Sequence, residues 1–144
     1  MRNAFRVGLV GAMVAVYGVT GGPAGATPPG PGVTGTVLFQ KTVGGTDYIY
    51  REITLPAHQS TGWHYHDGNL YAVVKQGTLS HFHSDCMSDG VYPRGSAFVE
   101  KGGTGNVHIG RNLGDTPVVL DVLYVLPHGS PLSEDAPNPG CDFQ

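Results

Sequence analysis

The sequence predicts an all-β protein, a jelly-roll barrel of about eight short antiparallel strands. Short runs of β-branched and aromatic residues alternate with Gly, Pro, Asp and Asn after residue 26, and no convincing helical stretch occurs there. Gly and Pro contribute 23 and 11 of the 144 residues, as closely spaced turns between such strands require. Apolar residues make up 40% of the chain, which is enough to form a packed core and excludes charge-driven disorder.

The predicted strands are separated by recognisable turns. Gly44-Gly45 and the segment 75–77 suit tight hairpins. Alternation is plainest in 47–55, where apolar residues occupy one face, although Arg51 interrupts it. The predicted strands are 36–43, 48–55, 62–66, 70–75, 78–83, 97–99, 107–111 and 118–126.

The first 26 residues have the pattern of a secretory signal peptide. Arg2 and Arg6 precede an uncharged stretch over 7–19, and small residues at 24–26 provide a cleavage position after Ala26. Glycines and a proline end the apolar run before the roughly 20 residues that a membrane span needs. We therefore expect a secreted, periplasmic or cell-envelope protein. Residues 27–35 are predicted to be a flexible lead-in with little to bury.

The two cysteines, Cys86 and Cys141, are predicted to form a disulfide. An even number of cysteines in an exported chain favours this pairing. The bond would tie the C-terminal tail 129–144 to the loop that contains Cys86. Neither cysteine belongs to a Cys-x-x-Cys pair or a basic cluster, which a thiolate metal ligand or nucleophile would favour.

The low charge of the chain limits its partners. Only 13% of the residues are Asp, Glu, Lys or Arg, and the formal net charge is −3. No basic face is available for a nucleic acid or an anionic membrane. We expect a small-molecule ligand, no nucleic acid, and no membrane partner after signal cleavage. A homodimer is a further option. The apolar run 118–126 would provide an edge for it if the run is an edge strand, and the same run suits a core strand equally well.

The histidines carry the clearest chemical signal. His64 and His66 form a His-x-His pair on a predicted strand, so both side chains point to the same face. They can share one metal ion if a third ligand comes from a neighbouring strand, and His108 is the natural candidate. Any one of these histidines alone would more often be a core residue with satisfied hydrogen bonds.

Two segments resemble the paired motifs of the cupins. These motifs are approximately Gly-x5-His-x-His-x3,4-Glu-x6-Gly and Gly-x5-Pro-x-Gly-x2-His-x3-Asn, and the segments here are GWHYHDGNLYAVVKQG and GSAFVEKGGTGNVHIGRN. The resemblance implies a small, single-domain, type-2-like cupin barrel over 36–128, with a metal on His64, His66 and His108. The matching residues are His64, His66 and Gly77 in the first motif, and Gly105, His108 and Asn112 in the second.

The chain departs from the family pattern at several positions. The metal-binding Glu of the family falls at Leu70, which cannot bind a cation. The opening Gly of the first motif falls at His58. In the second motif the Pro falls at Gly103, and Gly95 lies two residues further from that position than the motif requires. The resemblance therefore leaves three histidine ligands and no carboxylate in the usual position.

We considered three replacements for the missing Glu. Asn69 would alternate to the other face, and Asp67 more often caps the turn after His66. His81 shares the inward parity of its strand and is the best further candidate, although a core or rim histidine is its commoner role. Glu100, at a predicted strand end, is either a group that faces the barrel mouth or, as we expect, a solvated rim residue.

The ligand count predicts the chemistry. Three neutral imidazoles leave a divalent transition-metal ion with its full +2 charge, which favours an anionic or chelating oxygen ligand. Nitrogen ligands suit Zn, Mn, Fe, Cu or Ni alike. We expect an exported cupin-domain protein that binds such an ion and a small molecule in its barrel. The alternatives are a metal-free binding or structural cupin without activity, and an enzyme similar to the three-histidine dioxygenases of the family.

Overall fold

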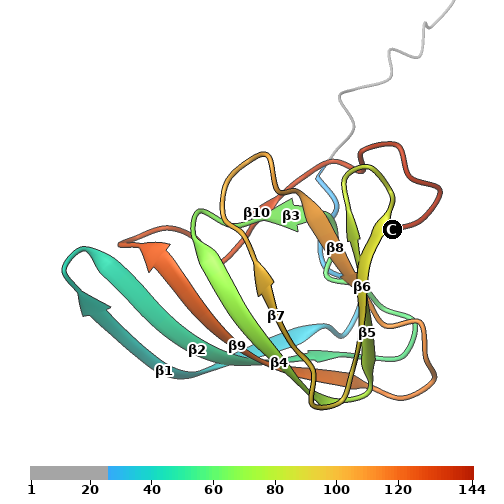
Figure 1. Ribbon diagram of the computed structural model, residues 1–144, viewed down its shortest axis with the longest axis horizontal. Helices are drawn as coiled ribbons and strands as arrows, with labels where there is room; N and C mark the ends of the chain where they lie inside the picture. The colour runs from blue at the N-terminus through green and yellow to red at the C-terminus, as the bar shows by residue number, and fades with distance from the viewer. Residues whose placement is uncertain (1–25) are drawn as a thin grey trace, which may run out of the picture.

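The computed structural model describes residues 26–144, and it confirms the all-β fold. Ten strands form two antiparallel five-stranded sheets, with the orders β1-β2-β9-β4-β7 and β10-β3-β8-β5-β6 (Figure 1). The predicted signal peptide lies outside the described residues, apart from Ala26. The strands are β1 (Thr34–Val43), β2 (Thr46–Leu55), β3 (His64–Tyr65), β4 (Asn69–Gln76), β5 (Thr78–His83), β6 (Ser88–Pro93), β7 (Ala97–Glu100), β8 (His108–Arg111), β9 (Val118–Pro127) and β10 (Glu134–Asp135).

Each of the eight predicted strands overlaps an observed one, and the sequence reasoning missed β6 and β10. The sequence of β6, SDGVYP, contains Asp, Gly and Pro and has the composition of a turn. The two residues of β10 are too few to show any periodicity. Strands occur from Thr34 to Asp135, so the two sheets extend beyond the predicted range 36–128 at both ends. Within residues 26–144 there is no helix of the length and apolarity that crossing a membrane requires.

The main core fills the space between the two sheets. Buried and partly exposed residues alternate along β9, as expected for a strand with one face on a core. The buried face of β4 contributes Leu70, Ala72 and Val74, and Leu79 of β5 meets them from the other sheet. β9 lies between β2 and β4, so the run 118–126 is a core strand and cannot serve as a strand edge. The expected homodimer stays a prediction, and it would need another surface.

A smaller core lies on the outer face of the second sheet. Trp63 and Ile109 are fully buried there. They adjoin His64 and His108 in sequence, so those histidines point to the opposite, inner face. Phe143 of the tail covers this small core, with its ring centroid 5.9 Å from that of Trp63. The tail is therefore a packed part of the barrel wall.

The predicted disulfide between Cys86 and Cys141 is present, and it joins the tail to the loop after β5. The start of the lead-in is also attached to this region, which differs from the expectation of little burial. Thr27 is buried, its Oγ1 accepts a 2.6 Å hydrogen bond from the Trp63 amide, and its amide donates to the Ala136 carbonyl at 3.0 Å. One threonine thus links the lead-in, the outer core and the tail.

We predict that loss of the disulfide destabilises the protein. The bond closes a sequence separation of 55 residues. Without it the unfolded chain gains conformational entropy worth about 4 kcal/mol. Denaturant unfolding of Cys86→Ser/Cys141→Ser should show this loss, and added dithiothreitol should have little further effect on that variant. An unchanged unfolding free energy would show that the tail holds the outer core without the bond.

Candidate metal centre

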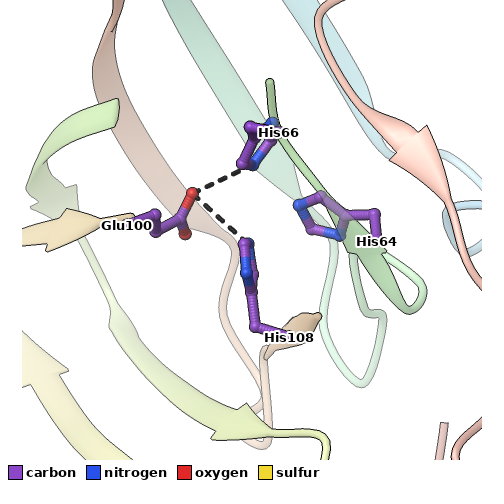
Figure 2. A group of neighbouring side chains, drawn as sticks. All are labelled: His64, His66, Glu100 and His108. Atoms are coloured by element: carbon purple, nitrogen blue, oxygen red, sulfur yellow. Dashed lines mark ion pairs between the residues drawn. The ribbon is translucent and has the colours of Figure 1, made fainter. Parts of the chain in front are cut away.

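Three histidines and one glutamate converge inside the barrel (Figure 2). His64 is on β3, His66 follows directly after β3, His108 begins β8, and Glu100 ends β7. Each residue offers one ligand atom, and these atoms all lie within 4.8 Å of one another. The histidines belong to one sheet and the carboxylate comes from the other, so the group bridges the barrel interior.

Strand pairing brings the three predicted histidines together. His64 and His108 are direct cross-strand partners between β3 and β8, and their ring centroids lie 4.5 Å apart. His66 lies two residues beyond His64 and faces the same way, with ring centroids 4.8 Å apart.

Glu100 provides the carboxylate that the first motif lacks. Leu70, in the family's Glu position, packs in the core and is 2% exposed. Its direct cross-strand partner on β7 is Glu100, so the two side chains share a face. The expectation that Glu100 is a solvated rim residue is wrong, because its side chain is only 13% exposed. Buried Phe98, two residues earlier on the strand, was the signal that Glu100 points inward.

The Glu100 carboxylate contacts three imidazoles. Its Oε2 lies 3.2 Å from His66 Nε2 and 3.5 Å from His108 Nε2, as the dashed lines in Figure 2 mark. Its Oε1 lies 3.3 Å from His81 Nε2. His81 is inward-facing and buried, as predicted, but it lies outside the group of four and contacts the carboxylate instead.

A second carboxylate holds His81 from its other side. His81 Nδ1 lies 2.6 Å from Asp89 Oδ1 on β6, and Asp89 Oδ2 lies 3.0 Å from His83 Nε2. Burial lowers the pKa of His81, but the carboxylates of Glu100 and Asp89 outweigh burial, and the net pKa is raised. His81 therefore holds its proton more strongly than a free imidazole does, and it contacts both carboxylates.

The remaining candidates lie away from this group. Asp67 and Asn69 are exposed, and the Asn69 side chain accepts a hydrogen bond from the Gly102 amide. His58 is largely exposed beside Asp115. Asn112 of the second motif is fully buried, and its amide bonds to loop backbone, which gives it a structural role.

The hydrogen bonds of the histidines leave their Nε2 atoms free to face the centre. In each ring Nδ1 lies against a backbone carbonyl, which only accepts, so in the neutral imidazole Nδ1 carries the proton and Nε2 keeps its lone pair. The Nε2 atoms of His66 and His108 are buried without a hydrogen-bond partner. In that form several lone pairs face one carboxylate, and a metal ion placed between them would give each of these groups a partner. The Nδ1–O distances are 2.8 Å for His64 and Gly62, 2.7 Å for His66 and Leu132, and 2.7 Å for His108 and Asn106.

The electrostatics favour the metal-binding forms of His64 and Glu100. Burial, followed by the neighbouring His108 and His66, lowers the pKa of His64 to about 3, so its imidazole is neutral at neutral pH. Burial opposes ionisation of Glu100, but the surrounding histidines, His108 first, hold its pKa well below its usual value. Neutral imidazoles with one carboxylate are a donor set that transition metals accept.

Cavities lie on two sides of the group. His64 and His66 line one of about 180 Å³, together with Arg51 and Tyr124. His108 lines another of about 220 Å³, together with residues that include His81, His83 and Asp89. The three histidines of the candidate centre therefore each border a cavity.

Comparison with solved structures identifies the fold. A double-stranded β-helix protein from Klebsiella pneumoniae matches with a TM-score of 0.59 and 18% identity, over 77% of this chain and 90% of that one. A cupin domain from Bordetella pertussis matches with a TM-score of 0.54 and 23% identity, over 66% and 94%. A cupin superfamily protein from Desulfitobacterium hafniense matches with a TM-score of 0.54 and 10% identity, over 67% and 79%.

These likenesses show that the chain has the cupin, or double-stranded β-helix, fold. No protein-family model and no curated protein matches the sequence. The fold and the site together define a cupin-fold protein with a buried group of three histidines and one glutamate suited to a metal ion.

We predict that Asn112 supports the fold and is not a metal ligand. Its amide donates to the carbonyls of Leu55, Pro56 and Thr116 at 2.8–3.1 Å. Asn112→Ala removes these three hydrogen bonds, and the free energy of unfolding should fall by roughly 2–3 kcal/mol. Chemical denaturation checks the loss, and an unchanged metal content per folded molecule checks the assignment. A variant of wild-type stability that has lost its metal would reverse the assignment.

Proposed function

We propose that this protein binds one divalent transition-metal ion through His64, His66, Glu100 and His108, and uses it to hold a small molecule in the barrel. The observation that carries the proposal is the convergence of three imidazole Nε2 atoms on a buried carboxylate, with each Nδ1 bonded to a backbone carbonyl. Backbone partners of this kind orient metal-binding histidines.

Glu100 changes the expected charge of the centre. With a carboxylate among the ligands, a divalent ion keeps a net charge of +1 rather than the +2 of a three-histidine site. A bound ion supplies Lewis acidity and open positions for an oxygen ligand. Three nitrogens and one oxygen accept Zn, Mn, Fe, Cu or Ni, so the donor set leaves the choice among these metals open.

The two alternatives are now less favoured. The metal-free cupin was suggested by Leu70, and the carboxylate of its cross-strand partner Glu100 removes that reason. The dioxygenase similarity rested on three histidines without a carboxylate, whereas Glu100 belongs to the group here. We therefore propose metal-dependent binding of a small molecule, and we propose no catalysed reaction.

Export to an oxidising compartment is also proposed. The disulfide between Cys86 and Cys141 supports it, because disulfides persist mainly outside the reducing cytosol. The signal-peptide pattern of residues 1–26 agrees with this location.

We predict that the metal-binding carboxylate functions from either of the two cross-strand positions, 70 or 100. Glu100→Leu removes a direct ligand and should weaken Zn²⁺ binding by more than about tenfold, since even indirect partners of metal ligands are worth about 10–100-fold. Leu70→Glu combined with Glu100→Leu exchanges the two side chains on the same inner face and should recover most of the affinity. Competition with a chelator measures the affinity, and elemental analysis of protein purified without a His tag measures the stoichiometry.

His108→Ala and His58→Ala provide the matched pair of histidine variants. His108→Ala should abolish tight binding and leave the fold intact, while the exposed His58→Ala should bind like the wild type. Wild-type metal content and affinity in His108→Ala or Glu100→Leu would contradict the proposed ligands.

A further inference from the structure

Arg51 interrupts the apolar inner face of β2. Ile49, Ile53 and Leu55 lie on this face, and Arg51 falls between them with the same parity. Its cross-strand partner on β9 is the buried Val122, so the arginine also points toward the barrel interior. A cation at such a position needs a partner, because an unpaired charge is costly to bury.

The partners of the Arg51 guanidinium are incomplete. Its Nη1 lies 3.3 Å from Tyr124 Oη, and its Cζ lies 5.6 Å from the Tyr124 ring centroid. Its Nε is buried without a hydrogen-bond partner, and Arg51 makes no ion pair within residues 26–144. Gly35 on β1 leaves room for the group, since a Cβ there would collide with Nη2. The guanidinium thus has capacity for an anion.

Arg51 and the candidate metal centre share one cavity. Arg51, Tyr124, His64 and His66 all line the space of about 180 Å³. The Tyr124 ring contacts both His66 and Arg51, because its centroid lies 5.9 Å from that of His66 and 5.6 Å from Arg51 Cζ. A small molecule in this cavity therefore borders both the guanidinium and the two histidines.

The Tyr124 hydroxyl can take part in anion binding. Its oxygen accepts from Arg51 Nη1, which leaves its own proton to be donated. The guanidinium and the hydroxyl present donors to the same space.

We infer that Arg51 and Tyr124 bind the carboxylate of the small molecule that the barrel holds. The ligand is then a short organic acid with a second oxygen donor directed at the histidine group. A guanidinium matches the planar geometry of a carboxylate and binds it through two parallel hydrogen bonds. This inference rests on the proposed function, because the second oxygen needs the metal ion.

Lactate and its uncharged amide, lactamide, test the inference. Zn²⁺-loaded protein of measured metal content is titrated with each compound by calorimetry, and the arginine Nε–H signals are followed by ¹⁵N NMR. Lactate should bind at least about tenfold more tightly than lactamide, because hydrogen bonds to a charged group are the stronger ones. The Arg51 Nε–H signal should shift with lactate.

Variants of Arg51 and Tyr124 test whether these residues bind the lactate carboxylate. Arg51→Gln should weaken lactate binding by about 10–100-fold without changing the Zn²⁺ content, and Arg51→Lys should restore only part of the affinity. Tyr124→Phe, which keeps the ring, should weaken it less and serves as the second variant if Arg51→Gln does not fold. The exposed Arg94→Gln is the matched control and should bind lactate normally.

The outcomes separate the two proposals. Equal binding of lactate and lactamide, or full lactate affinity in Arg51→Gln, overturns the carboxylate site while metal binding stands. Tighter binding of inorganic phosphate than of lactate at the same Nε–H signal also overturns it. If the protein takes up no Zn²⁺, the proposed function fails. The Arg51 signal of the metal-free protein then decides the anion site, since a lactate-specific shift upholds it and no shift overturns it.

Discussion

The contact between the Glu100 carboxylate and the imidazoles of the opposite sheet is the constraint on which the site depends. Elsewhere the two sheets meet through apolar side chains, but at this end they meet through a buried charge. A buried carboxylate without partners would cost several kcal/mol, so the histidines and Glu100 need one another. His81, held by Asp89, supports the carboxylate from a third direction. Figure 2 shows the side chains converging from both sides of the barrel.

The tail and the lead-in support the same site from outside the barrel. The Leu132 carbonyl orients the His66 ring, and Phe143 covers Trp63 behind β3. The disulfide to Cys141 holds that segment in place. The fold therefore uses a segment without periodicity to fix one of the predicted metal ligands.

The eight strands, and the shared face of His64 and His66, could be predicted from local composition and period-two spacing. His108 was predicted from its resemblance to the second cupin motif. Sequence reasoning missed Glu100 because the family motif placed the carboxylate at Leu70, whereas this chain carries it one strand away at the same register. Register between distant segments is a tertiary property and cannot be read from local spacing. It also missed β10, whose pairing with β3 depends on the folded tail. The sequence shows that Arg51 interrupts the apolar face of β2. Its proposed role in anion binding could be inferred only from the cavity that it shares with His64 and His66.

X-ray absorption spectroscopy of the metal-loaded protein observes the four proposed ligands themselves. We expect one metal ion per chain, with the scattering of three imidazole rings and one carboxylate oxygen at about 2.0–2.2 Å if the metal is zinc. Glu100→Leu should lose the carboxylate oxygen and keep the imidazole scattering. A wild-type spectrum with fewer than three imidazoles, or with sulfur or only water oxygen beside them, would contradict the assignment of His64, His66, Glu100 and His108 as the ligands.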